Sequence, residues 1–142
     1  MSDARIEITV DGSPVTGAAG DTILDALRGA GVETPTICYG ENLTPVNACR
    51  VCVVEVEGSR TLVPSCSRVA EPGMVIHTDS ERVRHSRRMV LEFLGTANDL
   101  SEAEQIGGWA DEYGADTSRY PETAERVEEP VRRQDELYVR DY

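Results

Sequence analysis

The chain has 142 residues, of which 39% are hydrophobic, a size that fits one compact domain with an appendage rather than two full domains. Its formal net charge of −12 argues against nucleic acid and anionic membrane surfaces as partners, because both carry charge of the same sign. The N-terminus shows no targeting signal and no stretch approaches transmembrane length, so we expect a cytoplasmic protein without membrane insertion.

An amphipathic hairpin opens the predicted fold. Ile6, Ile8 and Val10 alternate with polar residues, which is typical of a strand with one buried face. The sequence "DGSP" at 11–14 favours a turn, and a returning strand is therefore expected from Pro14.

A short helix and a long loop follow the hairpin. In "GDTILDALRGAG" we expect Asp21 to cap the helix and Gly29 or Gly31 to end it. Residues 32–50 show no hydrophobic period and contain several prolines, glycines and asparagines, which predicts a loop.

Strands return after the loop. "VCVVEVEG" predicts a strand that turns at 57–59 into "RTLVPSC", and "GMVIHTD" at 73–79 predicts a last short strand. Two strands, a helix, a loop and two or three further strands predict a small α+β domain whose mixed sheet packs on one helix.

The pattern becomes helical from residue 79. Val83, Val90 and Leu94 are at helical spacing, with Asp79 or Ser80 as the expected cap and Gly95 as the expected end. A second, more polar helix is expected over 101–113. Beyond it, charges and prolines predict an extended arm with a short helix around 123–129.

These elements predict three parts, namely a domain over 1–78, a helix over 79–97 packed on it, and an acidic C-terminal arm over 98–142. Trp109 and Tyr113, four residues apart, are expected to anchor the arm on the domain or on a partner. The helix also carries the strongest basic concentration: Arg82, Arg84, His85, Arg87 and Arg88. We interpret this run as a solvated helix face, with a docking surface for an acidic partner as the alternative.

Four cysteines carry the clearest chemical signal, with the spacing C-x10-C-x2-C-x13-C: Cys38, Cys49, Cys52 and Cys66. In a reducing compartment such a group indicates metal ligands rather than disulfides. A zinc site of four cysteines usually shows two C-x2-C pairs, whereas only Cys49 and Cys52 form one here. One tight pair and two isolated cysteines favour a [2Fe–2S] cluster, and zinc or disulfides remain alternatives.

The neighbours of the tight pair support sulfur binding. Asn47 and Ala48 precede Cys49, and asparagine adopts positive φ at modest cost. Such a backbone directs amide N–H groups inward at anionic sulfur, which is one of the features that set a reduction potential.

The segments "TPTICYGENL…ACRVCVVEVEG…LVPSC" and "RRMVLEFL" resemble the N-terminal [2Fe–2S] domain of the large iron–sulfur subunit of NADH-quinone oxidoreductase (respiratory complex I). Similar domains open NAD-linked formate dehydrogenase α-subunits and the diaphorase parts of NAD-reducing and iron-only hydrogenases. The resemblance covers about residues 4–97. It implies a β-grasp ferredoxin fold with Cys38, Cys49, Cys52 and Cys66 as the four cluster ligands.

Many of these relatives continue with one His and three Cys that bind a [4Fe–4S] cluster, but residues 95–120 contain neither residue type here. We therefore expect that second cluster to be absent. The end of the chain, "DELYVRDY", resembles the segment that leads into further cluster motifs in formate dehydrogenases. Two interpretations remain open: a truncated large subunit, or a small subunit that keeps this leader.

The expected function is one-electron transfer in a multi-cofactor oxidoreductase complex, of formate dehydrogenase, hydrogenase or NADH dehydrogenase type, without a catalytic site of its own. The expected partners are subunits or domains that carry iron–sulfur clusters or flavin. Because the protein is acidic, we expect a low potential, towards about −400 mV. The alternatives are a free-standing ferredoxin and a zinc-stabilised interaction module without redox activity.

Overall fold

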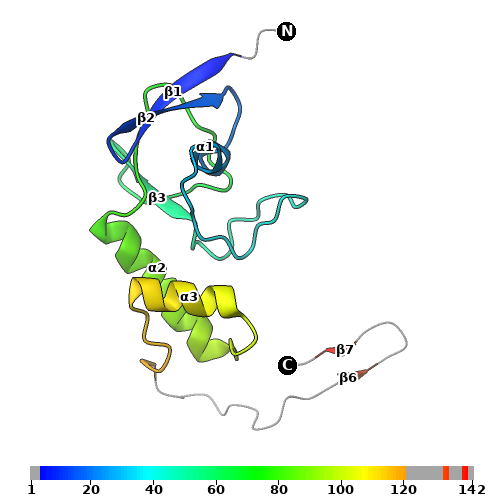
Figure 1. Ribbon diagram of the computed structural model, residues 1–142. Helices are drawn as coiled ribbons and strands as arrows, with labels where there is room; N and C mark the ends of the chain where they lie inside the picture. Colours follow the sequence, from blue (N-terminus) through cyan, green and yellow to red (C-terminus); the bar gives the residue numbers. More distant parts are fainter. Residues whose placement is uncertain (1–3, 121–132, 135–138, 141–142) are drawn as a thin grey trace.

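The computed structural model describes residues 4–120, 133–134 and 139–140 (Figure 1). Its elements within these residues are β1 (Arg5–Val10), β2 (Ser13–Ala18), α1 (Ile23–Gly29), β3 (Val53–Val56), β4 (Val63–Pro64), β5 (Val75–His77), α2 (Glu81–Ala97), α3 (Glu104–Tyr113), β6 (Arg133–Gln134) and β7 (Val139–Arg140). The helix expected around 123–129 lies outside the described residues. Among the helices that are described, none has the length and apolar character needed to cross a bilayer.

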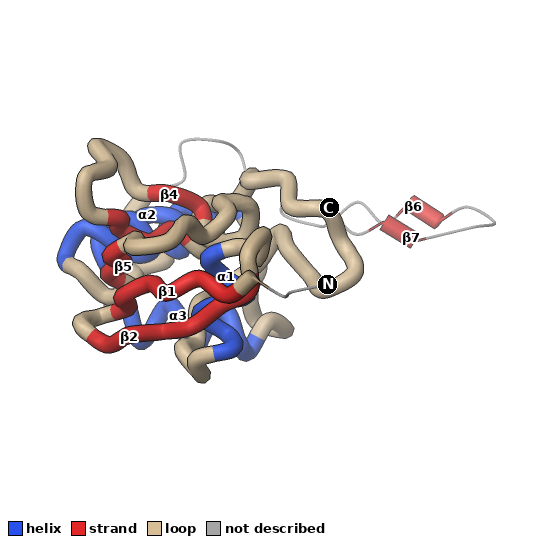
Figure 2. Tube along the Cα trace, turned by 90° about the horizontal axis from the view of Figure 1, so that it is seen from above, coloured by secondary structure: helices blue, strands red, loops and turns tan. Residues whose placement is uncertain are grey.

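Five strands form one mixed sheet in the order β2-β1-β5-β3-β4, and β6 pairs with β7 separately. β1 and β5 run parallel, while the other neighbours in the sheet are antiparallel. Figure 2 shows β1 and β2 side by side at one edge of the sheet. The predicted α+β class is confirmed, and the arrangement is consistent with a β-grasp ferredoxin-like domain.

The first hairpin closes through a two-residue turn. Asp11 and Gly12 have φ values of 48° and 83°, and Val10 pairs with Ser13 across the turn. Positive φ at both central positions is the type I′ geometry that matches the twist of antiparallel strands. The Asp11 carboxylate also accepts a hydrogen bond of 2.8 Å from the backbone N–H of Thr78, so the turn is tied to the end of β5.

Helix α1 packs on the sheet and forms the main core with it. Ile23 and Leu27 of the helix are fully buried against Ile8, Val54 and Ile76 from three strands. In β1 the buried residues Ile6, Ile8 and Val10 alternate with more exposed ones, as predicted, whereas in β3 the neighbours Val53 and Val54 are both buried. The core therefore lies between α1 and one face of the sheet.

The predicted cap of α1 was wrong by one residue. Thr22, not Asp21, is the N-cap: its hydroxyl accepts from the backbone N–H of Asp25 at 3.1 Å, and the Asp25 carboxylate accepts from the Thr22 N–H at 3.1 Å. This reciprocal pair is a capping box. Asp21 instead accepts a hydrogen bond of 2.9 Å from the N–H of Ala18 and holds the end of β2.

Helix α2 is capped by Ser80, one of the two predicted caps, but its buried face differs from the predicted one. The fully buried residues at four-residue spacing are Val83, Arg87 and Leu91, whereas Phe93 is 55% exposed. The interpretation of the basic run as a solvated face is wrong for Arg87, which is only 2% exposed. A hydrophobic pattern cannot reveal an arginine on the buried face because it scores every arginine as polar.

Helix α3 crosses α2 (Figure 1) and begins later than the predicted residue 101. It ends at Gly114, whose φ of 65° places it in the left-handed region typical of a helix C-terminus. Tyr113 is buried with Val51 and Leu91, and Trp109 packs against the same group. The predicted anchoring of the arm by Trp109 and Tyr113 is thus confirmed, and its target is the domain itself.

Gly95 does not end α2, which continues to Ala97, but it is required by a close approach. A Cβ atom at Gly95 would lie 2.6 Å from the Cβ of Thr117, in the segment that returns over α2 after α3. The same segment is held by Arg119, which pairs at 3.0 Å with the buried carboxylate of Glu92. Glycine is therefore the residue that lets this segment lie against the helix.

We predict that Gly95→Ala destabilises the protein by about 1–3 kcal/mol, because overpacking at Thr117 outweighs the helix propensity of alanine. The matched control is Gly108→Ala in α3, where a Cβ meets no atom within 4 Å. There the substitution should stabilise by about 0.5–1 kcal/mol. Urea unfolding of both variants checks the opposite signs, and a stabilised Gly95→Ala protein would contradict this account.

Candidate metal centre

The four cysteines come together from three segments. Cys38 and Cys49 lie in the loop between α1 and β3 and are half-buried. Cys52 directly precedes β3 and is 2% exposed, and Cys66 follows β4 and is 1% exposed. All four are free thiols.

Strand pairing fixes the two buried cysteines. β3 and β4 are antiparallel with Val53 opposite Pro64, so Cys52 and Cys66 extend from the same end of the pair. The buried hydroxyl of Ser65 donates a hydrogen bond of 2.7 Å to the carbonyl of Cys52. The backbone N–H of Leu24 in α1 donates to the carbonyl of Ser65 at 2.9 Å, which connects the helix to this corner.

The loop near Cys49 uses left-handed backbone at two positions. Asn47 has a φ of 56°, as its residue type predicted, and Arg50 has a φ of 60°, which the sequence did not indicate. The Asn47 side-chain oxygen accepts hydrogen bonds from the Ser67 hydroxyl at 2.6 Å and from the Cys66 thiol at 3.6 Å. Asn47 therefore joins the loop to the segment that carries Cys66.

Burial and amide groups act differently on the outer and inner thiols. At Cys38, burial alone would raise the pKa of the thiol, but hydrogen bonds from Cys49 and from the backbone of Ala48 together lower this pKa below its ordinary value. At Cys66, burial, followed by the hydrogen bond and charge of Cys52, raises the pKa to about 12. The inward-pointing amides expected beside Cys49 are thus present and directed at sulfur.

The thiols contact one another as two pairs, Cys38 with Cys49 and Cys52 with Cys66. Within the described residues, no three His, Cys, Asp or Glu side chains form a group that could hold a single metal ion. Two thiol pairs side by side fit a binuclear centre, in which four thiolates are shared between two irons. The donor set and the sulfur-directed amides therefore fit a [2Fe–2S] cluster.

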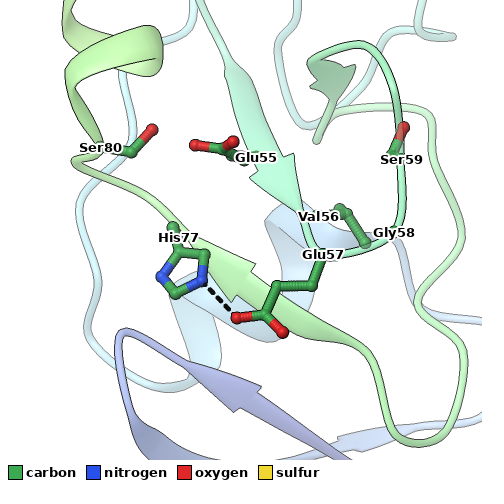
Figure 3. Close-up of a pocket in the computed structure, with 7 residues that line it drawn as sticks. All are labelled: Glu55, Val56, Glu57, Gly58, Ser59, His77 and Ser80. Atoms are coloured by element: carbon green, nitrogen blue, oxygen red, sulfur yellow. Dashed lines mark hydrogen bonds and ion pairs between the residues drawn. The ribbon is translucent and has the colours of Figure 1, made fainter.

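A separate surface hollow of about 600 Å³ lies along β3 and β5 (Figure 3) and contains no cysteine; it is lined by Glu55, Val56, Glu57, Gly58, Ser59, His77 and Ser80. His77 Nε2 lies 2.9 Å from a Glu57 carboxylate oxygen. Hydrogen bonds from Ser80 and then Arg82 lower the pKa of Glu55, so this carboxylate belongs to an ion pair. These groups are surface partners of one another, and no cysteine lines the hollow.

Residues 3–81 match the model of a known family, described as a 2Fe-2S iron-sulfur cluster binding domain. The chain belongs to this family. It therefore binds a [2Fe–2S] cluster, as the spacing and the resemblance predicted. The match covers β1 to β5, α1 and all four cysteines, and it ends as α2 begins.

Similar curated proteins are subunits of large redox enzymes. The chain is 38% identical over 132 residues to the mitochondrial NADH-ubiquinone oxidoreductase 78 kDa subunit of Candida albicans, covering 84% of this chain and 18% of that subunit. It is 45% identical over 97 residues to the NADP-reducing hydrogenase subunit HndD of Solidesulfovibrio fructosivorans, covering 64% of this chain and 16% of that subunit. The chain thus spans less than a fifth of the length of these relatives.

A solved structure shows the same fold. A chain in the crystal structure of an NAD+-reducing [NiFe]-hydrogenase in the H2-reduced state superposes with a TM-score of 0.72 at 27% identity. The superposition covers 82% of this chain and 52% of that one. Since 82% of the chain is more than residues 3–81 make up, the likeness extends beyond the part that the family model matches.

We predict that Asn47 sets how long the cluster stays bound. Asn47→Gly keeps the left-handed backbone but loses the side-chain bond to Ser67, whereas Asn47→Ala also adds strain of about 1–2 kcal/mol. Cluster lifetime, followed as loss of visible absorbance in mild denaturant, should decrease from wild type to Asn47→Gly to Asn47→Ala. Equal lifetimes for the two variants would show that the backbone conformation does not matter.

Proposed function

We propose that this chain carries single electrons through a [2Fe–2S] cluster held by Cys38, Cys49, Cys52 and Cys66, as part of a larger oxidoreductase. The observation that supports this most directly is the meeting of four free thiols as two pairs inside a domain of the 2Fe-2S family. Within the pairs, Cys38 and Cys49 would hold one iron and Cys52 and Cys66 the other. When bound, the cluster supplies a one-electron redox couple.

The two cysteine pairs have different surroundings: the inner pair is buried, and the outer pair is partly exposed and accepts amide hydrogen bonds. Cys52 and Cys66 are buried with Leu24 and against Tyr39, which excludes water from the inner side. Amide groups of the loop donate to the sulfur of Cys38, which favours negative charge there. Because Cys38 and Cys49 are the partly exposed ligands, an electron partner reaches the centre most closely on their side.

The partners are inferred from the relatives. The two curated relatives described above are named as subunits of an NADH oxidoreductase and an NADP-reducing hydrogenase, which favours other subunits of such a complex as the electron donor and acceptor. We propose that these subunits carry flavin or iron–sulfur clusters. A formate dehydrogenase complex remains a prediction from the resemblance alone.

The setting and the division of the chain are also proposals. Four free thiols suit a reducing compartment, so we propose the cytoplasm and no membrane insertion. We also keep the proposed division into an iron–sulfur domain over 1–78, a helix over 79–97 and an arm over 98–142. The packing of Tyr113 against Leu91 supports a helix and an arm that act as one support for the domain.

We predict that anaerobically purified protein is coloured, contains about two irons and two acid-labile sulfides per chain, and gives a rhombic EPR signal once reduced. Cys52→Ala and Cys66→Ala should each abolish the colour, because each removes one of four ligands. The matched control is Ser59→Ala, in the turn between β3 and β4, whose hydroxyl bonds the Thr61 carbonyl at 2.8 Å rather than any group at the thiols; it should keep the iron content. Colourless wild-type protein with one zinc per chain would instead establish the zinc module.

Membership in a complex needs a separate measurement. In native extract the chain should elute from size-exclusion chromatography with subunits that contain flavin or further iron–sulfur clusters, identified by fluorescence, metal analysis and mass spectrometry. Elution of the coloured chain alone at the size of a monomer would establish a free-standing ferredoxin instead.

A further inference from the structure

Arg87 is a buried cation whose hydrogen bonds reach the backbone beside Cys52. Its side chain is directed into the domain from the middle of α2, and the residue is 2% exposed. One terminal nitrogen donates to the Tyr113 hydroxyl at 2.7 Å and the other donates to the carbonyl of Val53 at 3.1 Å. Val53 directly follows Cys52, so the guanidinium is bonded one residue away from a buried thiol.

The guanidinium has no carboxylate partner within the described residues. The neighbouring arginines of α2 differ: Arg82 pairs with Glu55 and Arg84 with Asp79, each at 2.8 Å, and both are substantially exposed. Arg87 instead has neutral oxygen acceptors and the face of the Tyr113 ring at 5.4 Å, while its Nε is buried without a hydrogen-bond partner. Its charge is therefore buried and, as far as residues 4–120 go, has no ionic partner.

A buried charge without a counter-charge costs several kcal/mol, and it persists where a compensating charge lies nearby. No carboxylate in the described part of the chain pairs with Arg87 to supply that charge. A bound cluster would concentrate negative charge at the cysteine sulfurs. Arg87 bonds the carbonyl of Val53, which follows Cys52, and bonds Tyr113, which belongs to the packed group against which Cys49 lies. The buried positive charge of Arg87 and the negative charge of a bound cluster would therefore compensate each other.

We propose that Arg87 is the internal counter-charge of the iron–sulfur centre and raises its reduction potential; this inference rests on the ligands proposed above. With four thiolates, two sulfides and two ferric irons, the oxidised centre carries a charge of −2, and reduction adds one more negative charge. A fixed buried cation stabilises the reduced state more than the oxidised state. Arg87 is a positioning residue in this role, since it acts through space and through the backbone next to Cys52.

Coulomb's law gives the scale of the effect. For unit charges about 10 Å apart at an effective dielectric constant of about 20, the reduced-to-oxidised ratio at fixed potential changes about tenfold. For a one-electron couple this ratio corresponds to about 59 mV. Removing the charge of Arg87 should lower the potential by about this amount.

The test is a redox titration of the holoprotein monitored by EPR. Arg87→Gln and Arg87→Met remove the charge and should lower the potential, whereas Arg87→Lys keeps the charge and should stay near the wild-type value. The matched control is Arg84→Gln, which changes the net charge equally on the same helix but at an exposed, paired position. Tyr113→Phe removes a hydrogen bond of Arg87 without removing charge and should also leave the potential nearly unchanged.

The outcomes distinguish an electrostatic role of Arg87 from a purely structural role. A lowered potential in the neutral variants alone supports the proposal, and so does loss of the cluster in both neutral variants with retention in Arg87→Lys. An unchanged potential in the neutral variants overturns it, as does an Arg87→Lys variant that shifts or loses its cluster as they do. Wild-type protein without a cluster would instead overturn the proposed function, which keeps the two failures apart.

Discussion

The pairing of β3 with β4 is the constraint on which the metal centre depends. This short antiparallel ladder places Cys52 before one strand and Cys66 after the other, at the same end, and Ser65 binds the Cys52 carbonyl across the gap. Regular backbone hydrogen bonds therefore position the inner sulfur pair. The outer pair, Cys38 and Cys49, lies on a loop that lacks such a ladder, so its position depends on left-handed residues and on the metal itself.

The sequence predicted the elements that follow simple periodicity. Alternation identified β1, and the turn residues identified the hairpin, because strand and turn chemistry are local. Features that depend on contacts between segments distant in the chain were predicted less well from the sequence. Gly95 had the signature of a helix end, yet its role is to admit Thr117 against α2, a contact between residues distant in the chain. Thr22 was missed as a cap because Asp21, beside it, is an equally good cap by residue type.

At the candidate site, spacing and resemblance predicted the four cysteines, and the preference of asparagine for positive φ predicted Asn47. Two features remained hidden. Arginine has no preference for the left-handed region, so nothing in the sequence marked Arg50. Arg87 was counted with a solvated basic run, since composition assigns charge to the surface and only tertiary structure shows that one arginine of the run is enclosed by β3 and α3.

This enclosed arginine changes how the acidity of the protein bears on its redox chemistry. A net charge of −12 disfavours an added electron, but of the charged residues that the structure describes only Arg87 and Glu92 are buried, so solvent and salt screen the others. A single buried cation next to the ligands is screened far less and acts over a shorter distance. The acidic surface therefore lowers the reduction potential and the internal arginine raises it. Each surface charge has a smaller effect on the potential than the buried charge does, because it is screened more strongly.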